Sequence, residues 1–400
     1  MAESTAGRHT FRSMLKKRSG LRLKKGSNLY ANMQKIAIIG SGIIGMTLAN
    51  YLDQKNYQVT LFDEPTGQAT RASAGIISPW LSKRRNKQWY QLAKDGAAFF
   101  PNLIQDFQLD QTIYQQSGTL LLRPEKQLDE LLALAEDRKK SAPEIGTIEL
   151  LSGEQTQRAL PLLKPLPALK ISGGGRLDGK AYLRHMRKKA EEKGIHFITQ
   201  RVQLANNHTV CFGENEEEFD QIILTVGPHL KELLAPLGYR VDLRPQKGQL
   251  LVFQTDFKTS GEFPVAMLDG EADLIPFLDG KILLGATHEN DAGWDLEETP
   301  AAFEQLTDSA RSFLAEPEKL LAAPVHYRVG TRAYTSDFAP FFGSLNEQLL
   351  VASGLGSSGL TTGPYIGYLL AQYLNTGKAD WQVYQKELAT YIQHEKTLES

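Results

Sequence analysis

The glycine pattern Gly40-x-Gly42-x-x-Gly45 constrains the fold more than any other feature of this sequence. It follows a short apolar run, residues 35–39, and opens a segment, residues 43–53, with apolar side chains near helical spacing. An apolar run without alternation is typical of a strand buried on both faces of a parallel sheet. Residues 57–62 then alternate as a second strand. The order strand, glycine turn, helix, strand predicts an α/β fold.

Each glycine of this turn has a physical role in a dinucleotide site. Gly40 permits a tight turn, Gly42 removes a side chain where a pyrophosphate must approach, and Gly45 lets the helix pack closely on the strand. The helix N-terminus then presents N–H groups to the phosphates. Asp63 lies 18 residues past Gly45, where a carboxylate can bind a ribose hydroxyl pair. The alternatives are a glycine turn in a nucleotide-free domain and, for Asp63, a solvated strand-end acid.

Two further segments favour FAD over a nicotinamide cofactor. Residues 68–79 are a run of small side chains, which lets the backbone pass close to a bulky planar group. Residues 354–363 hold several glycines and a Ser-Ser pair just before a predicted helix, residues 363–375. Reduced flavin carries negative charge near N1 and the C2 carbonyl, which a helix N-terminus and free N–H groups stabilise. An ordinary surface loop and a flexible glycine loop are the respective alternatives.

Together these motifs resemble the D-amino acid oxidase superfamily, and within it the glycine oxidase and D-amino acid dehydrogenase branch. The similarity runs from about Lys35 to Leu374. Besides the two glycine turns it includes residues 72–79, 174–178, 222–228, 245–249, 284–287 and 330–332. The resemblance implies noncovalent FAD in an elongated pose, with the backbone of Val202 at the adenine. It also implies a substrate domain built on an antiparallel sheet.

The cofactor residues expected from the glycine turns and from the resemblance form one set, and no metal site is expected. They are Gly40, Gly42, Ile43, Ile44, Gly45, Asp63, Ala72, Ser73, Ala74, Gly75, Ile76, Val202, Gly227, Gly356, Ser357, Ser358, Gly359 and Leu360. Ser357 and Ser358 depart from the family pattern, in which larger polar residues are frequent. The flavin or substrate contacts that such larger residues supply are therefore not carried over to this chain.

Arg332 is the residue expected to hold the substrate. It ends the segment 330–332 and precedes Asp337 and Pro340, and the resemblance places the arginine of this pattern at the substrate carboxylate. A guanidinium fork matches a carboxylate in bidentate geometry, which a lysine would not reproduce. The alternative is a surface salt bridge, with Arg328 equally placed to form one.

Asp273 occupies a position at which glycine oxidases tend to place an aromatic residue that lines the substrate pocket. A carboxylate there can receive an amino-bearing substrate or face solvent, and we expect solvent. No general base is required, because positioning and flavin electrostatics carry the chemistry. Structural or surface roles are expected for His229, His288, His326 and Lys247, while Trp80, Arg84 and Arg85 border the pocket entrance or lie on a helix surface.

The cofactor motifs lie at both ends of the chain, with helical and β-rich material between them, which indicates discontinuous domains. We expect residues 33–82, 168–235 and 327–400 to form a Rossmann-like FAD-binding domain around a parallel sheet. Residues 83–167 and 236–326 are expected to form a substrate domain with an antiparallel β-sheet and helices. The expected fold class is therefore α/β.

Residues 1–32 differ from the rest of the chain in composition, since they hold eight Lys or Arg and one acid. They lack the continuous apolar region of a secretory signal. We expect a disordered basic extension, with an organellar address or a true start at Met33 as alternatives. The remaining residues include 37 basic and 45 acidic side chains, so no field favours nucleic acid or an anionic membrane.

The single cysteine, Cys211, rules out an intrachain disulfide. No stretch is apolar enough to predict a transmembrane helix, and we expect a cytoplasmic protein. The expected activity is FAD-dependent oxidation of a small amino acid, glycine or D-amino acid-like, to an imine that hydrolyses to a 2-oxo acid and ammonia. The electron acceptor is O2 or another oxidant. Alternatives are oxidation of an N-methyl amino acid or a 2-hydroxy acid, and a flavin-binding subunit of a partner-dependent dehydrogenase.

Overall fold

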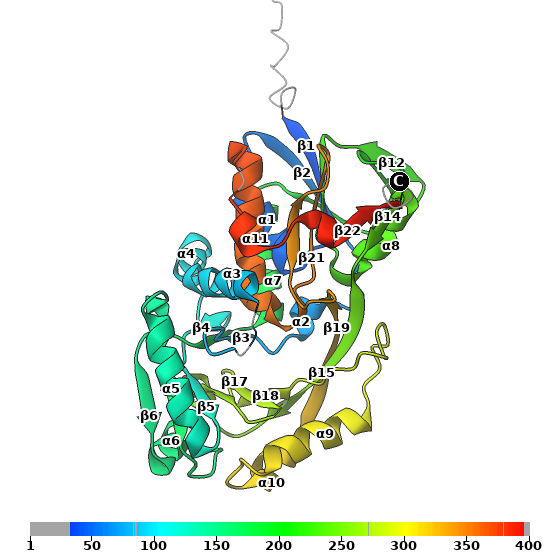
Figure 1. Cartoon of the computed structure of the whole chain (residues 1–400). Helices are drawn as coiled ribbons and strands as arrows, with labels where there is room; N and C mark the ends of the chain where they lie inside the picture. Colours follow the sequence, from blue (N-terminus) through cyan, green and yellow to red (C-terminus); the bar gives the residue numbers. More distant parts are fainter. Residues whose placement is uncertain (1–32, 83, 85, 271, 379, 396–400) are drawn as a thin grey trace, which may run out of the picture. The chain divides into compact units, whose positions relative to one another are not determined.

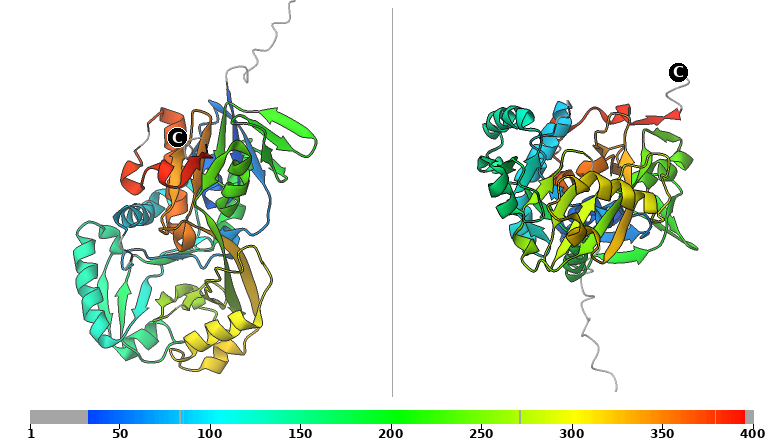
Figure 2. Two further views of the ribbon diagram at one scale, coloured as in Figure 1. Left: turned by 45° about the vertical axis from the view of Figure 1, so that its right-hand side comes forward. Right: turned by 90° about the horizontal axis from the view of Figure 1, so that it is seen from below.

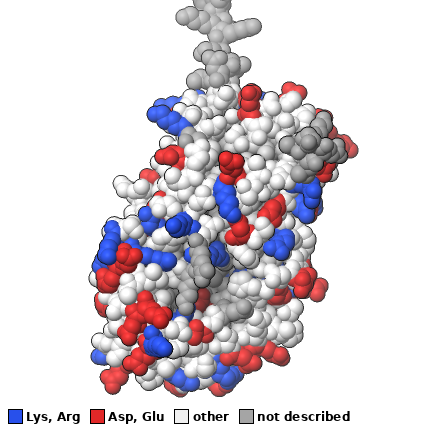
Figure 3. Space-filling view, viewed as in Figure 1, with Lys and Arg blue, Asp and Glu red and all other residues white. Residues whose placement is uncertain are grey.

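The computed structural model describes residues 33–82, 84, 86–270, 272–378 and 380–395. The predictions for residues 1–32 and for Arg85 lie outside these residues. Figure 1 shows two main sheets with helices on their faces, and the elements alternate along the chain as in α/β proteins. None of the helices in the described ranges combines the length and the hydropathy needed to span a bilayer. On the face shown in Figure 3, basic and acidic side chains are interspersed.

A six-stranded sheet carries the glycine turn. Its order is β20 (Phe341–Ser344), β21 (Leu349–Ser353), β13 (Gln221–Leu224), β1 (Gln34–Ile39), β2 (Tyr57–Asp63) and β9 (His196–Thr199). All neighbours pair in parallel except β20 with β21. The central position of β1 explains its continuous apolar run, because both of its faces are buried. The predicted α/β class with a parallel sheet is confirmed.

Each face of this sheet has its own hydrophobic core. Ile36 and Ile38 of β1 pack with helices α1 (Ile43–Tyr51), α7 (Gly179–Glu192) and α11 (Gly359–Thr376). Ala37 and Ile39 pack on the other face, with α8 (Leu230–Leu234) and the small sheet β10 (Gln203–Leu204), β11 (Thr209–Phe212) and β12 (Asn215–Glu218). A short pair, β14 (Tyr239–Val241) and β22 (Ile392–His394), completes this layer.

An eight-stranded, mainly antiparallel sheet forms the second layer. Its order is β19 (Val325–Tyr334), β15 (Arg244–Gln254), β18 (Lys281–Gly285), β17 (Asp273–Pro276), β16 (Val265–Met267), β5 (Thr119–Leu122), β7 (Ala168–Ile171) and β6 (Ile148–Leu151). The Asp279-Gly280 pair, a sequence typical of tight hairpin turns, joins β17 to β18, and both residues have positive φ, 58° and 77°. This combination is the geometry that a two-residue hairpin requires.

Helices cover both faces of the eight-stranded sheet, as the views in Figure 2 show. Helices α9 (Pro300–Arg311) and α10 (Pro317–Leu321) pack on one face through Leu306 and Leu320. Helix α5 (Glu125–Lys139) packs on the opposite face, where Leu121 and Leu169 point. Helix α6 (Gly153–Ala159) follows β6. Strands β7 and β19 belong to this sheet, although the sequence-based division places most of their residues in the cofactor domain.

The segment between the two sheets contains the small-residue run. Helix α2 (Ala69–Ala72) leads into β3 (Ile76–Ile77), which pairs with β8 (Gly175–Leu177) beside β4 (Tyr114–Gln115). Helices α3 (Lys87–Ala98) and α4 (Phe100–Phe107) follow. Helix α11 begins at Gly359, four residues before the predicted start, and contains Pro364. The predicted start was wrong because residues 359–362, which were assigned to the glycine-rich turn, already form the first turn of the helix.

Candidate active site

The glycine turn after β1 has the geometry that the sequence predicts. Gly40 has φ +103°, a conformation that side chains disfavour. A Cβ on Gly45 would lie 2.0 Å from the carbonyl oxygen of Gly40, so the close packing of α1 on the turn requires glycine there. A Cβ on Gly42 would contact only Thr70 Oγ1, at 3.7 Å, because this position borders an open groove. Local sterics thus shape one wall of the groove.

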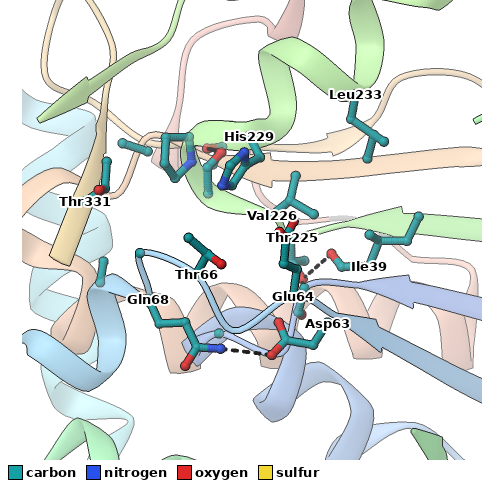
Figure 4. A pocket seen from close by; sticks show the side chains of 18 of the residues that line it. Ile39, Asp63, Glu64, Thr66, Gln68, Thr225, Val226, His229, Leu233 and Thr331 are labelled. Carbon is teal, nitrogen blue, oxygen red and sulfur yellow. Dashed lines mark hydrogen bonds between the residues drawn. The ribbon is translucent and has the colours of Figure 1, made fainter. Parts of the chain in front are cut away.

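Asp63 lies at the end of β2 and lines the same groove (Figure 4). Its Oδ1 accepts from the Ser41 N–H at 3.0 Å, and its Oδ2 accepts from Gln68 Nε2 at 2.9 Å. The remaining amide oxygen of Gln68, Oε1, is buried without a hydrogen-bond partner among the described residues. A buried acceptor of this kind calls for a donor from a ligand or water. The carboxylate is therefore held in place at the point where a ribose is expected.

The groove brings together predicted residues from both ends of the chain. Those that line it are Gly40, Gly42, Ile43, Ile44, Asp63, Val202, Gly227 and Gly356, together with Arg332. The N–H of Ile43 at the start of α1 donates to Thr70 Oγ1, so one helix N-terminal donor expected for the phosphates already has a partner. His229 also lines the groove, and its ring lies 4.2 Å from that of Trp294.

The other predicted cofactor residues lie beside this groove and do not line it. Ala72, Ser73, Ala74, Gly75 and Ile76 form the end of α2 and the start of β3, and Gly359 and Leu360 open α11. Gly75 has φ +89°, and a Cβ there would lie 2.2 Å from the carbonyl oxygen of Leu177. Gly75 therefore allows β3 to approach β8. Ala74 and Ile76 instead pack against the eight-stranded sheet.

The two serines of the C-terminal glycine turn contact helix α3 and the loop before it. Ser357 Oγ accepts from Arg84 Nη2 at 2.9 Å, and Ser358 Oγ accepts from Trp89 Nε1 at 3.0 Å. The Arg84 guanidinium lies over the Trp89 ring, 4.7 Å from its centre. Trp80, the other residue considered for the entrance, is buried and donates through Nε1 to Glu144. Arg84 thus reaches the turn, whereas Trp80 belongs to the core.

Arg332 lies on β19, and three other residues position its side chain. Its Nη1 donates to the carbonyl oxygen of Thr287 at 2.8 Å and to Gln246 Oε1 at 3.2 Å. A Cβ on Gly248 would lie 2.5 to 2.7 Å from the guanidinium atoms, so this glycine makes room for them. Nη2 has no hydrogen-bond partner among the described residues, and burial lowers the pKa of Arg332. One edge of a desolvated cation is therefore available to an anion.

A comparison with known proteins identifies the family. The profile of the DAO family, FAD dependent oxidoreductases, matches residues 35–373. The chain belongs to this family. It is 38% identical over 354 residues to the uncharacterized oxidoreductase YurR of Bacillus subtilis. This alignment covers 85% of this chain and 94% of YurR. The glycine oxidase of Pseudomonas aeruginosa is 28% identical over 357 residues, or 86% of this chain and 95% of that enzyme.

Solved structures agree with this FAD-dependent oxidoreductase assignment. Iminodiacetate oxidase (IdaA) from Chelativorans sp. BNC1 superposes with a TM-score of 0.81 at 30% identity, covering 86% of this chain and 96% of that one. Glycine oxidase from Geobacillus kaustophilus superposes with a TM-score of 0.75 at 19% identity, covering 88% and 98%. The second match supports the fold alone. The cofactor of the family is FAD, as the sequence predicts.

The residues of this oxidoreductase fit FAD. The groove runs from the glycine turn and Asp63 to the C-terminal turn at Gly356, so it joins the regions expected for phosphate, ribose and flavin. Gly42 leaves space at the turn, and the unpartnered Gln68 Oε1 can accept from a hydroxyl group. These contacts need no covalent attachment.

Gly248→Ala is expected to displace the Arg332 guanidinium while leaving the FAD groove intact. The new Cβ would overlap the guanidinium, and a misplaced anchor lowers kcat/KM by about ten- to hundredfold. FAD content of the purified protein stays unchanged. Steady-state kinetics with any substrate that reduces the flavin measures the effect. Glu130→Ala, at an exposed position of helix α5, is the control; an equal kinetic loss in both variants would contradict the role of Gly248.

Asp273 does not face open solvent, so that expectation is wrong. It is half-buried on β17, paired with Gly285, and its Oδ1 accepts from the Leu268 N–H at 3.1 Å. It shares a face of the sheet with Ile275, which packs in a cluster with Ala74 and Ile76. Burial raises the pKa of Asp273 to about 7. The sequence could not reveal this burial, because it arises from strand pairing.

Asp273→Asn is expected to remove a pH dependence of stability. Because the folded pKa of about 7 exceeds the ordinary value of 3.8, the folded chain binds this proton more tightly than the unfolded chain. The resulting stabilisation is complete below about pH 4 and is lost as pH rises through 7. Between pH 5 and pH 8 the parent therefore loses about 1–3 kcal/mol more than the variant. Urea denaturation at both pH values tests this, with exposed Asp279→Asn as control; parallel pH profiles for parent and Asp273→Asn would contradict it.

Sequence reasoning missed the residues that position others. The Arg332 guanidinium is positioned by Gln246, Gly248 and Thr287. The only sequence signal for a role of these three residues is that they lie in segments that resemble the family. The contact of Trp294 with His229 had no signal in the sequence. Lys247, for which a structural role is expected, is fully buried and donates to Asp295 Oδ2 at 2.6 Å.

Proposed function

We propose that this flavoprotein oxidises the Cα–N bond of a small amino acid, glycine or D-amino acid-like. The observation that carries the proposal is the open guanidinium edge of Arg332 at the FAD groove, with Nη1 fixed by Thr287 and Gln246. A carboxylate on this edge forms two parallel charged hydrogen bonds. The similarity to a glycine oxidase at 28% identity supports the same class of substrate.

The protein's own contribution is positioning. Arg332 binds the carboxylate and thereby fixes the direction of the substrate Cα–H bond. Bound FAD would supply the acceptor, at its N5, for the hydride that leaves Cα. Loss of hydride and of the amine proton leaves an imine, and one water molecule converts it to a 2-oxo acid and ammonia. The turn at Gly356 and the start of α11 stabilise negative charge on the cofactor. We propose that O2 or another acceptor takes up the electrons. We also propose that the protein resides in the cytoplasm.

The second candidate substrate is an N-substituted amino acid with two carboxylates. Iminodiacetate oxidase is 30% identical to this chain. A second guanidinium, that of Arg84, contacts the C-terminal turn, and its Nη1 is buried without a partner among the described residues. Tyr334 interacts electrostatically with both Arg84 and Arg332, and burial lowers the pKa of both arginines. Two partly buried cations that each interact with Tyr334 would suit a dianionic substrate.

Anaerobic mixing of FAD-loaded protein with candidate substrates tests the proposal. The panel consists of glycine, D- and L-amino acids, sarcosine, iminodiacetate and 2-hydroxy acids. Loss of the visible absorbance of the oxidised flavin reports reduction. Product assays then separate the classes, since a primary amine yields ammonia, sarcosine yields an aldehyde from the methyl group or glyoxylate, and iminodiacetate yields glycine and glyoxylate. Reduction by hydroxy acids alone, or by no member of the panel, contradicts the proposed function.

A further inference from the structure

A second cavity, of about 700 Å³, lies beside α2 and is distinct from the FAD groove. Its walls come from the loop before α2, the first turns of α7, the β17–β18 hairpin and the start of β19. It shares Gly67 and Gln68 with the FAD groove but contains neither the glycine turn nor Arg332. Its size is that of a small-molecule site. The oxidation proposed above uses none of its charged residues.

The charges of this second cavity are mostly positive. The basic lining residues are Arg71, Lys180, Arg184, Lys281 and Arg328, and the acidic ones are Asp178 and Asp279. The five cations converge from four separate elements, in a chain whose residues beyond position 32 are acidic in sum. Burial, together with Arg328, Lys281 and Lys180, lowers the pKa of His326 in the same cavity. The cavity thus concentrates positive potential, which attracts anions.

Arg328 is the most buried cation of the second cavity. Its side chain is 12% exposed, and its Nη2 lies 3.2 Å from Asp178 Oδ2. Asp178 also caps α7, because its Oδ1 accepts from the Ala181 N–H. Nη1 of Arg328 is buried and has no hydrogen-bond partner among the described residues. A rigidly held guanidinium with an unmet donor is a feature of oxyanion sites.

The remaining wall of the second cavity is apolar. Phe277, Leu278, Leu296, Ala72 and Val329 line it. An inorganic ion would use only the cationic side, whereas a ligand with an organic body and a terminal dianion would use both. A phosphate monoester carries about two negative charges at neutral pH and three acceptor oxygens. Several separated cations can bind those oxygens at once.

We propose that this second cavity is a binding site for a small organic phosphate monoester. Arg328 and Lys281 bind the phosphate, with Arg71, Lys180 and Arg184 completing the positive rim. The organic group rests on Phe277 and Leu278. Because Gln68 lines both this cavity and the FAD groove, and holds Asp63, a ligand here contacts the segment that shapes the cofactor site.

Calorimetric titration with phenyl phosphate tests the proposal. The protein is first saturated with FAD, which keeps the probe out of the cofactor groove. We expect saturable binding with one site per chain. Two related anions serve as comparisons: phenyl sulfate is a monoanion with the same ring, and inorganic phosphate lacks the ring. Each is expected to bind at least about tenfold more weakly than phenyl phosphate.

A charge-matched pair of double variants locates the binding. Arg71→Gln/Lys281→Gln removes two cations from the rim of the second cavity, and both positions are at least partly exposed, so the fold is retained. This variant is expected to bind phenyl phosphate about tenfold more weakly. Lys126→Gln/Lys258→Gln removes two exposed cations elsewhere and is expected to bind like the parent.

Three outcomes would overturn the proposal. One is the absence of phenyl phosphate binding to the FAD-saturated parent at millimolar concentrations. Another is equal binding by the two double variants. The third is tighter binding of citrate than of phenyl phosphate, which would assign the cavity to polycarboxylates. Flavin reduction by an amino acid is measured separately, so failure here leaves the proposed oxidation intact.

Discussion

Replacing Arg332 by alanine is expected to lower kcat/KM for the flavin-reducing amino acid by about two to three orders of magnitude. Loss of one partner of a buried, hydrogen-bonded charge pair costs about 2–5 kcal/mol, and each 1.4 kcal/mol is about a factor of ten. The cost is high here because the guanidinium is desolvated and has one edge open to a carboxylate. FAD content is expected to stay at the parental level, since the glycine turn and Asp63 are untouched.

Arg332→Lys separates charge from geometry. A lysine retains the positive charge but cannot form the planar two-point contact, so it is expected to recover only a minor part of the loss. Stopped-flow reduction of the flavin gives both the rate and the apparent substrate affinity. Arg187→Ala, at an exposed ion pair with Glu191, is the surface control. Unchanged turnover and unchanged ligand effects on the flavin spectrum in Arg332→Ala would contradict the carboxylate site.

Alanine substitutions at two of the three glycines of the cofactor turn are expected to have different effects. In Gly45→Ala the new Cβ would lie 2.0 Å from a backbone oxygen and 2.6 Å from Thr225 Oγ1. Backbone atoms cannot rotate away, so overpacking costs about 3 kcal/mol of folding stability. In Gly42→Ala the nearest atom is at 3.7 Å and φ is −71°, so the apoprotein is expected to fold with nearly parental stability.

The Gly42→Ala protein is nevertheless expected to bind FAD poorly. Its Cβ would occupy the place where the pyrophosphate approaches α1. An overpacking cost of about 1–3 kcal/mol corresponds to a Kd for FAD about ten- to hundredfold higher. Urea denaturation of the apoproteins and fluorescence titration with FAD measure the two effects independently. Parental FAD affinity in Gly42→Ala would show that the cofactor does not approach this turn.

The sequence by itself determined the local parts of this oxidoreductase. The strand, glycine turn and helix at residues 34–51 and the hairpin turn at Asp279-Gly280 follow from backbone conformations and hydrogen bonds within a few residues. The family resemblance also singled out Arg332 as the expected substrate anchor, which stays a prediction. Such features are readable because their causes lie next to one another in the chain.

Only the tertiary structure decided where side chains from distant strands meet. Arg332 binds Gln246 and Thr287, which lie 86 and 45 residues away, and it fits because Gly248 has no side chain. Asp273 becomes half-buried because β17 pairs inside a sheet. The cations of the second cavity come from segments separated by more than 200 residues. Burial and electrostatic coupling depend on this long-range packing, which no local pattern of residues encodes.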